Sequence, residues 1–234
     1  DLSSGTTLSA GEAVLGTVTT YGGQDVLVAK FAPDGALLWS LHAGGPSVDV
    51  GLKLALGSAG LAVTGIFTGT ADLFGSSFSA QGGSTDLFVA LLNTFDGQAQ
   101  WVRTAGGPGY TDTPAGITFN SMNEVAVAGK FKGDAVFGTD TLHSAINFTT
   151  QQPSFDVFVA KWSSTGVFQW VKQGTGHRDD EAVDLVSGPD NMLYATGQFS
   201  NTITFDAQHP NTTLNIIFTV KLDPSGNERW FRQC

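Results

Sequence analysis

Four aspartates occupy matching places in the sequence, each just ahead of a segment that reads as a β-strand. The segments are LSSGTTLS, VGLKLALG, PAGITFNS and EAVDLVSG. If these strands surround one axis, four carboxylates converge there, and like charges at close range need a cation between them. Hard oxygen ligands suit calcium or magnesium. The candidate metal ligands, with Ca²⁺ as the expected ion, are Asp1, Asp49, Asp112 and Asp180.

A second interpretation of these aspartates needs no metal. Aspartate often accepts hydrogen bonds from backbone N–H groups of an adjacent turn, and each of the four can hold its own turn in this way. Asp25, Asp86 and Asp156 directly follow glycine- or serine-rich turns, so for them the turn role is the stronger expectation. Both interpretations of the first four aspartates are open at this stage.

The densest run of charged residues is HRDDE, at positions 177–181, where the other copies of the repeat described below have glycine, proline or serine. A departure from a repeated loop can mark a ligand or partner site, whereas the alternative is an ordinary solvated charge run. Aromatic rings outside the strands are candidate carbohydrate contacts. The candidate ligand or partner residues are His177, Arg178, Asp179, Glu181 and Tyr110.

Motifs that carry catalytic chemistry are missing from the sequence. It contains no HExxH, GxSxG, P-loop lysine or CxxC motif, and its four histidines are scattered singly. We therefore expect no catalytic residues, no cofactor site and no enzyme activity. An enzyme with a site on the loops is kept as an alternative, because a fold does not determine a function.

The elements that position these residues form a fourfold repeat. Trp39, Trp101, Trp170 and Trp230 lie in ALLWSLHA, QAQWVRTA, VFQWVKQG and NERWFRQC, and each segment directly follows a glycine. Short turns join them to DVLVAKF, DLFVALL, DVFVAKW and IIFTVKL, which predicts hairpins. EAVLGTV, LAVTGIF, VAVAGKF and LYATGQF lie further upstream. With the aspartate-led segments, each copy predicts four strands.

Most of these strands are apolar on both sides, as DVLVAKF illustrates. An antiparallel sheet with two apolar faces must be covered on each side, and radial stacking of copies provides that cover. A β-sandwich would instead need one polar face on each strand. We predict an all-β fold, a single β-propeller domain over residues 1–234. Its four-stranded antiparallel blades span approximately 1–43, 44–105, 106–173 and 174–234, as a closed four-bladed ring or part of a larger propeller.

The repeat resembles the seven-bladed β-propeller repeat of bacterial secreted and surface proteins. GGQDVLVAKFAPDGALLW, residues 22–39, is the copy most similar to that pattern, and the resemblance covers essentially the whole chain. It implies a propeller and export from the cytoplasm, and it implies no activity. The fourth copy departs from the pattern, since Ile216 replaces the aspartate, so we expect it at an end.

The composition narrows the classes of molecule that the protein is expected to bind. Twenty-one acidic and eleven basic residues give a net charge of −10, which disfavours nucleic acid and anionic lipid. Apolar runs such as LAVTGIF are too short to span a bilayer, so no transmembrane segment is expected. The lone Cys234 excludes an internal disulfide, and Asn147-Phe148-Thr149 and Asn211-Thr212-Thr213 are candidate glycosylation sites.

These observations favour a non-catalytic binding or scaffold module that is extracellular, on the cell surface or periplasmic. Its expected role is adhesion, recognition or assembly of a surface structure, with a protein or glycan partner. The main alternative is a carbohydrate-binding lectin, whose sites would lie between blades and recur with the repeat. Self-assembly is a variant of the first hypothesis, because repeated units offer similar surfaces to one another.

Overall fold

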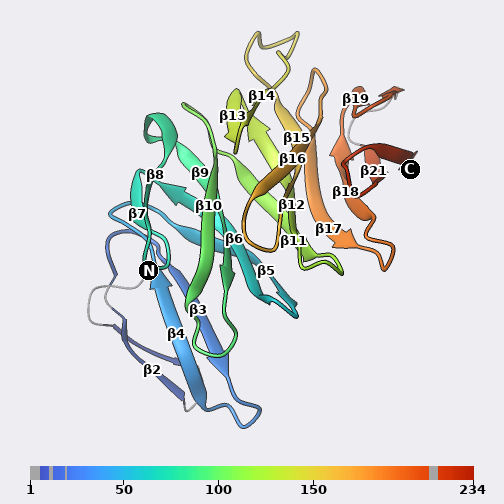
Figure 1. Ribbon diagram of the computed structural model, residues 1–234. Coiled ribbons are helices and arrows are strands. Elements are labelled where there is room, and N and C mark those ends of the chain that lie inside the picture. The colour runs from blue at the N-terminus through green and yellow to red at the C-terminus, as the bar shows by residue number, and fades with distance from the viewer. Residues whose placement is uncertain (1–5, 11–12, 19, 211–215) are drawn as a thin grey trace.

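The computed structural model describes residues 6–10, 13–18, 20–210 and 216–234, with side chains from residue 20 onward (Figure 1). The described part consists of β-strands in antiparallel sheets, with one short 3₁₀ helix, Gln81–Gly83. The predicted all-β class is confirmed. Within this part of the chain, no helix has the length and apolar character needed to cross a bilayer.

Three sheets contain the four main strands that the repeat predicts. In each sheet the strands are hydrogen-bonded in the order first, second, third, fourth. The strands are β5 (Val50–Gly57), β6 (Gly60–Thr68), β9 (Thr85–Leu92) and β10 (Ala99–Gly106) in the second unit; β11 (Thr113–Phe119), β12 (Val125–Lys132), β15 (Phe155–Trp162) and β16 (Phe168–Gly174) in the third; and β17 (Glu181–Ser187), β18 (Leu193–Phe199), β21 (Ile216–Leu222) and β22 (Glu228–Gln233) in the fourth.

The central strands of the second and third units are buried on both faces, as predicted from their lack of apolar alternation, whereas β18 and β21 of the fourth unit are fully buried on one face only. In β9 every residue from Asp86 to Leu92 is buried. Leu87, Val89 and Leu91 enter the core shared with the third unit, while the alternate residues enter the core shared with the first. Because successive side chains of a strand point to opposite faces, one strand contributes to two cores. Each sheet is therefore held by its neighbours rather than by solvent-facing polar residues.

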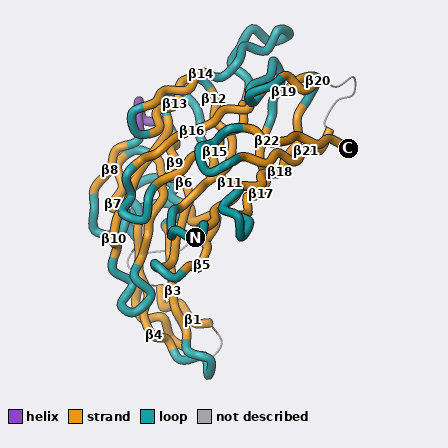
Figure 2. Tube along the Cα trace, turned by 45° about the vertical axis from the view of Figure 1, so that its right-hand side comes forward, coloured by secondary structure: helices purple, strands orange, loops and turns teal. Residues whose placement is uncertain are grey.

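The sheets follow one another along a curved path, with the N-terminal hairpins at one end and the C-terminal sheet at the other (Figures 1 and 2). The first strands lie next to one another on one side of this path, because β11 contacts both β5 and β17. This arrangement places the starts of the three aspartate-led strands along a common line.

Short hairpins connect the second and third strands of each complete unit. Each one bonds to the end of the preceding sheet: β13 pairs with β10, Asp72 bridges to Gly44, and Thr204 bridges to Thr175. Phe137 and Phe205 in these hairpins are buried. The hairpins are β7 (Thr70–Asp72) with β8 (Ser77–Ser79), β13 (Asp134–Phe137) with β14 (Asp140–His143), and β19 (Thr202–Thr204) with β20 (Gln208–Pro210).

The first unit differs from the predicted four-stranded sheet. β3 (Val26–Phe31) and β4 (Leu37–Ala43) form a two-stranded sheet, and β1 (Thr6–Ala10) and β2 (Ala13–Val18) form another, which contacts β4 and does not pair with β3. The sequence contains the reason. DLSSGTTLSA, residues 1–10, matches DLFGSSFSA, residues 72–80, which makes the short hairpin of the second unit. Residues 6–10 and 13–18 therefore do not supply the first two strands of a four-stranded sheet.

Hydrogen exchange should reveal this incomplete sheet. The amides of β3 are expected to exchange faster than those of β9, because β3 has one paired neighbour and β9 lies between β6 and β10. Mass spectrometry of peptides covering residues 26–31 and 87–92 compares the two directly. Equal protection of both strands would contradict the arrangement described for the first unit.

Candidate functional site

Asp49, Asp112 and Asp180, which precede the first strands, are buried, and each accepts a hydrogen bond from a backbone N–H group. Asp49 is shielded from solvent and accepts hydrogen bonds from the N–H of Gly45 at 2.7 Å and of Thr68 at 3.1 Å. Asp112 and Asp180 are buried in the same way and accept equivalent bonds. The donors are Gly107 N–H (2.9 Å) and Lys132 N–H (3.3 Å) for Asp112, and Ser200 N–H (3.0 Å) for Asp180.

Each of these carboxyl groups interacts with an aspartate from the third strand region of the preceding unit. Burial raises the pKa of Asp112 to about 7 and that of Asp180 to about 8, and the neighbouring aspartate adds to each shift. Burial also raises the pKa of Asp49, Asp86 and Asp156. The junctions that contain Asp112 and Asp180 thus hold protons near neutral pH. The pairs are Asp25 with Asp49, Asp86 with Asp112, and Asp156 with Asp180.

The contacts favour the turn role for these residues. Asp49 and Asp112 use both carboxyl oxygens for backbone N–H groups, while Oδ2 of Asp180 is buried without a hydrogen-bond partner. Asp1 lies outside the described residues, and the sequence match places it opposite Asp72 rather than Asp49. In the ranges that the structure covers, no three Asp, Glu, His or Cys side chains gather as a metal site would need. The axial calcium site stays a prediction.

The charged loop at residues 177–181 is tied to its surroundings rather than freely solvated. The His177 ring stacks on Phe148 with ring centroids 3.8 Å apart, and Asp179 accepts a hydrogen bond from Phe155 N–H at 3.0 Å. Arg178 is exposed and has no acceptor among the described residues. The loop therefore presents one free cation and one stacked, exposed aromatic pair.

A row of alternating rings and lysines connects the remaining two candidates, Tyr110 and Glu181. The Lys132 ammonium lies 5.2 Å from the centroid of the Tyr110 ring and 5.1 Å from that of Phe155. The Lys130 ammonium lies 5.0 Å from the centroid of the same Phe155 ring and 2.6 Å from Glu181 Oε2. We call these five residues the lysine–aromatic row. Sequence analysis identified its two ends and missed its middle.

Charge is unevenly balanced along this row. The hydrogen bond from Lys130 lowers the pKa of Glu181 and more than offsets the effect of partial burial. Lys132 has no oxygen acceptor in the part of the chain that the structure describes, although both rings contact its ammonium group. A cleft of about 460 Å³ between β5, β11 and β17 adjoins the row and is lined by Lys53, Lys130 and Glu181, among others.

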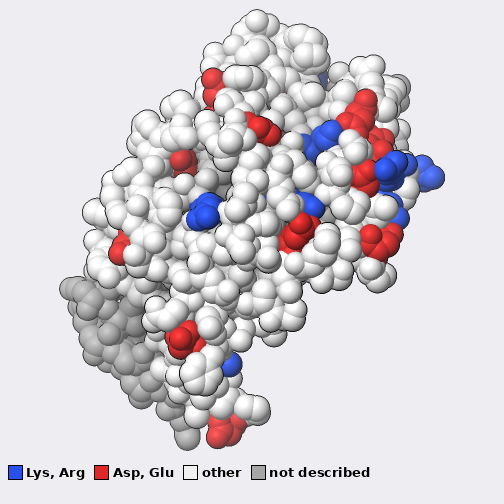
Figure 3. All heavy atoms as spheres, in the orientation of Figure 1, with Lys and Arg blue, Asp and Glu red and all other residues white. Residues whose placement is uncertain are grey.

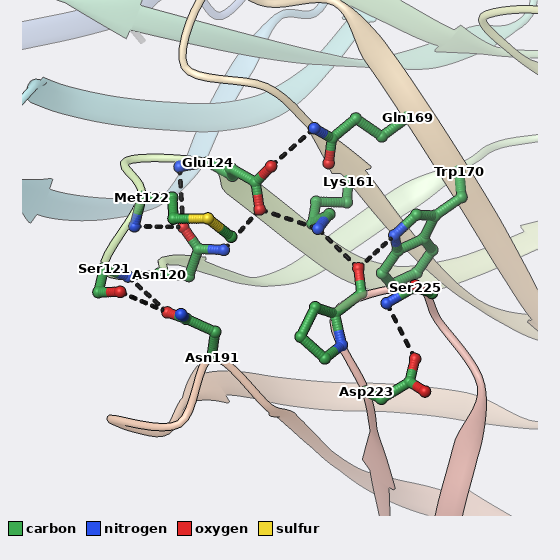
Figure 4. Close-up of polar contacts among 11 residues, drawn as sticks. Asn120, Ser121, Met122, Glu124, Lys161, Gln169, Trp170, Asn191, Asp223 and Ser225 are labelled. Carbon is green, nitrogen blue, oxygen red and sulfur yellow. Dashed lines mark hydrogen bonds and ion pairs between the residues drawn. The ribbon is translucent and has the colours of Figure 1, made fainter.

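A different junction connects the sheets at the other end of the third strands. Lys161 and Trp170 are cross-strand partners, and both donate to the carbonyl oxygen of Pro224 in the next unit, at 2.7 and 3.0 Å (Figure 4). Glu124 accepts from Lys161 at 2.8 Å. The first two units repeat this arrangement. Lys30 and Trp39 donate to Thr94 O (2.7 and 3.2 Å), while Trp101 donates to Ser164 O (3.1 Å) and Arg103 to Gly166 O (2.7 Å).

Three of the four glycines that precede the tryptophan segments have a role at this junction. Gly166 has φ +76° and lies under the Trp101 ring, where an added Cβ would be 2.7 Å from the indole. Gly97 and Gly226 are placed in the same way under Trp39 and Trp170. The equivalent Gly35 has φ +88° and nothing within 4 Å of such a Cβ. In three of the four copies, the glycine that precedes the tryptophan segment therefore contacts the tryptophan of the preceding unit.

Comparison with known proteins does not assign this chain to a family. No protein-family model matches the sequence, and no curated protein matches it. The likeness to the propeller repeat thus rests on the motifs quoted above, and the function has to be argued from the described contacts.

Proposed function

We propose that the chain is built as a β-propeller, with the repeated sheets as blades, and that it acts as a non-catalytic binding module outside the cytoplasm. The regular succession of sheets, their doubly buried strands and the adjacent first strands support the propeller. Hydrogen bonds to turns support structural rather than catalytic roles for Asp49 and Asp112. The binding role therefore falls on surfaces where the units differ.

The observation that carries this proposal is that the Lys132 ammonium contacts two aromatic rings and has no oxygen acceptor among the described residues. Five of the other six lysines have oxygen acceptors: Lys30 has a carbonyl, and Lys130, Lys161, Lys172 and Lys221 have carboxylates. Lys53 has neither an acceptor nor a ring contact among the described residues, so Lys132 differs from it in being held by two rings. On the face drawn in Figure 3, charges of both signs gather over the C-terminal part of the molecule, while the middle is nearly uncharged. A lysine held by two rings and lacking a carboxylate is suited to receive one from a ligand.

We assign the lysine–aromatic row to an acidic segment of a protein partner. A ligand carboxylate would bond to the Lys132 ammonium, while apolar parts of the ligand pack on the Tyr110 and Phe155 rings. The exposed Phe148 on the neighbouring loop extends the apolar contact. The same combination of rings and a cation also supports the lectin hypothesis, with an acidic polysaccharide as the ligand.

Binding to two acidic polymers tests the proposal. Titration with a polyglutamate peptide and with polygalacturonate should show salt-sensitive binding to the peptide, and Lys132→Gln should weaken it about tenfold through loss of one charge-assisted contact. Lys172→Gln is the matched control, because Lys172 is already paired with Asp206. Binding to the polysaccharide alone would favour the lectin. No binding to either polymer, or equal loss in both variants, would contradict the proposed site.

A further inference from the structure

A polar cleft with a volume of about 710 Å³ follows the outer strand of the second unit, β10, and the neighbouring hairpin of β7 and β8. The half-buried rings of Phe74 and Phe78 line it together with the exposed side chains of Gln98, Arg103 and Thr165. None of these five residues belongs to the lysine–aromatic row. The cleft thus combines aromatic rings with an amide, a hydroxyl group and a guanidinium.

Two carbonyl groups hold the Arg103 guanidinium in place. Its Nε donates to Gly166 O and an Nη donates to Val102 O, both at 2.7 Å. Among the described residues, no carboxylate lies within ion-pair distance of it. On the face drawn in Figure 3, the basic atoms over β10 have no acidic atoms against them. Since a guanidinium has more N–H donors than these bonds use, Arg103 is a fixed cation with donors left for a ligand.

One position of each hairpin lies close to the fourth strand of the preceding unit. The hairpins can be aligned by the residue that pairs with the end of that strand, because this bridge occurs at all three junctions. Two positions after the bridge, the side chain differs from one hairpin to the next. The bridging residues are Asp72, Val136 and Thr204, and the later ones are Phe74, Gly138 and Asp206.

At two junctions the side chain at this hairpin position matches the one that stands two residues after the tryptophan of the fourth strand. Between the third and fourth units a lysine faces an aspartate, and the two form an ion pair. Between the first and second units both side chains are apolar and pack against the same core. Between the second and third units an arginine has a glycine at the matching position. The pairs are Lys172 with Asp206, Leu41 with Phe74, and Arg103 with Gly138.

These comparisons indicate a ligand with a carboxylate and hydroxyl groups. A carboxylate balances the cation at the next junction, and guanidinium groups bind carboxylates through paired hydrogen bonds. The side-chain amide of Gln98 has no hydrogen-bond partner among the described residues and can bond to a hydroxyl group. Phe74 and Phe78 offer ring surfaces to the C–H groups of a sugar. An added peptide strand fits less well, because the Arg103 bond to Val102 O occupies a backbone acceptor on this edge of β10.

We propose that this cleft is a binding site for a uronic acid residue of an acidic polysaccharide. The sugar carboxylate bonds to the Arg103 guanidinium, in the role that an aspartate has at the next junction. Gln98 and Thr165 bond to hydroxyl groups, and the sugar ring packs against Phe78. This site is additional to the lysine–aromatic row, so either proposal can fail without the other.

Titration calorimetry with trigalacturonate tests the site. Binding should be saturable, and the fully methyl-esterified trisaccharide should bind about tenfold more weakly, because it keeps the sugar rings and loses the carboxylates. Arg103→Gln should weaken trigalacturonate binding to a similar extent. Lys172→Gln, at the equivalent position of the next unit, is the matched control and should bind like the parent protein, because Lys172 is already paired with Asp206. No binding, or equal affinity for the charged and esterified sugars, overturns the proposal.

A second variant keeps the test independent of the bonds that Arg103 makes to the protein. Gln98→Glu places a carboxylate in the cleft and should weaken binding about tenfold by repulsion, and because this side chain is exposed the fold should persist. Val186→Glu adds the same charge at an exposed residue of β17 and should leave the affinity unchanged. Unchanged affinity in both Arg103→Gln and Gln98→Glu overturns the proposal. Loss of binding in Lys132→Gln, with Arg103→Gln unaffected, overturns it too and places the saccharide at the lysine–aromatic row.

Discussion

Stability is expected to fall as the pH rises from about 4 to about 8, because buried carboxyl groups at the sheet junctions lose their protons. Asp112 and Asp180 have pKa values of about 7 and about 8 in the folded protein, against 3.8 as the ordinary value. At pH values between the ordinary pKa of 3.8 and these raised values, the folded state binds more protons than the unfolded state. By linkage, each such group lowers the free energy of unfolding by up to about 1.4 kcal/mol per pH unit.

The direction of this dependence follows from the raised pKa values. Below about pH 4 the unfolded carboxyl groups are protonated too, so the stabilisation is fully present there, and it is lost as the pH passes the folded value of about 8. The raised pKa values of Asp49, Asp86 and Asp156 act in the same direction. Groups with lowered pKa, such as Glu124 and Asp206, have the opposite effect on stability. The stabilisation that they provide is lost as the pH falls below about 4.5.

Urea unfolding at several values between pH 5 and pH 8 measures this slope. Asp180→Asn should flatten it, because an amide accepts the Ser200 N–H bond and cannot ionise. Asp140→Asn changes an exposed aspartate that does not act on Asp180 and should leave the slope unchanged. A stability that rises across this range would contradict the assignment of protonated carboxyl groups to the junctions.

Local patterns predicted the strands and offered the turn role as one of two interpretations of the aspartates ahead of the first strands. The order of strands, their double burial and the Asp49 and Asp112 turns each depend on residues close in sequence. The pairing of Asp49 with Asp25 and of Asp112 with Asp86 depends on how consecutive units pack together. A sequence repeat does not define that packing. The first unit was misread because EAVLGTV has the composition of a strand, although its neighbours match a short hairpin.

The lysine–aromatic row shows why a repeat can conceal a site. Its lysines end the strand VAVAGKFK, where the equivalent segments read LAVTGIFT and LYATGQFS. The difference was visible in the sequence, but those positions were assigned to a shared strand motif and not compared between copies. Phe155 reaches the row only because β15 pairs with β12, so that Phe155 lies opposite Lys132. Comparing copies position by position would have identified both lysines as departures.

A methyl group added at Gly166 is expected to destabilise the protein far more than the same change at Gly35. Both residues have left-handed φ angles, which cost about 1 to 2 kcal/mol for alanine. At Gly166 the new Cβ would also lie 2.7 Å from the Trp101 ring, and overpacking of this kind adds about 1 to 3 kcal/mol. Gly35 holds the equivalent turn position with open space around it, so Gly35→Ala isolates the conformational cost.

A double-mutant cycle separates the clash from other effects. Trp101→Leu removes the ring that the alanine meets, so the penalty of Gly166→Ala should shrink by about 0.5 to 3 kcal/mol in that background. Guanidinium unfolding of the parent, both single variants and the double variant provides the coupling energy. Equal penalties in the two backgrounds would mean that the Trp101 indole does not rest on this turn. Junctions between units would then depend on the buried aspartates, the shared cores and the hydrogen bonds to the next unit, rather than on the packing of an indole ring against a glycine turn.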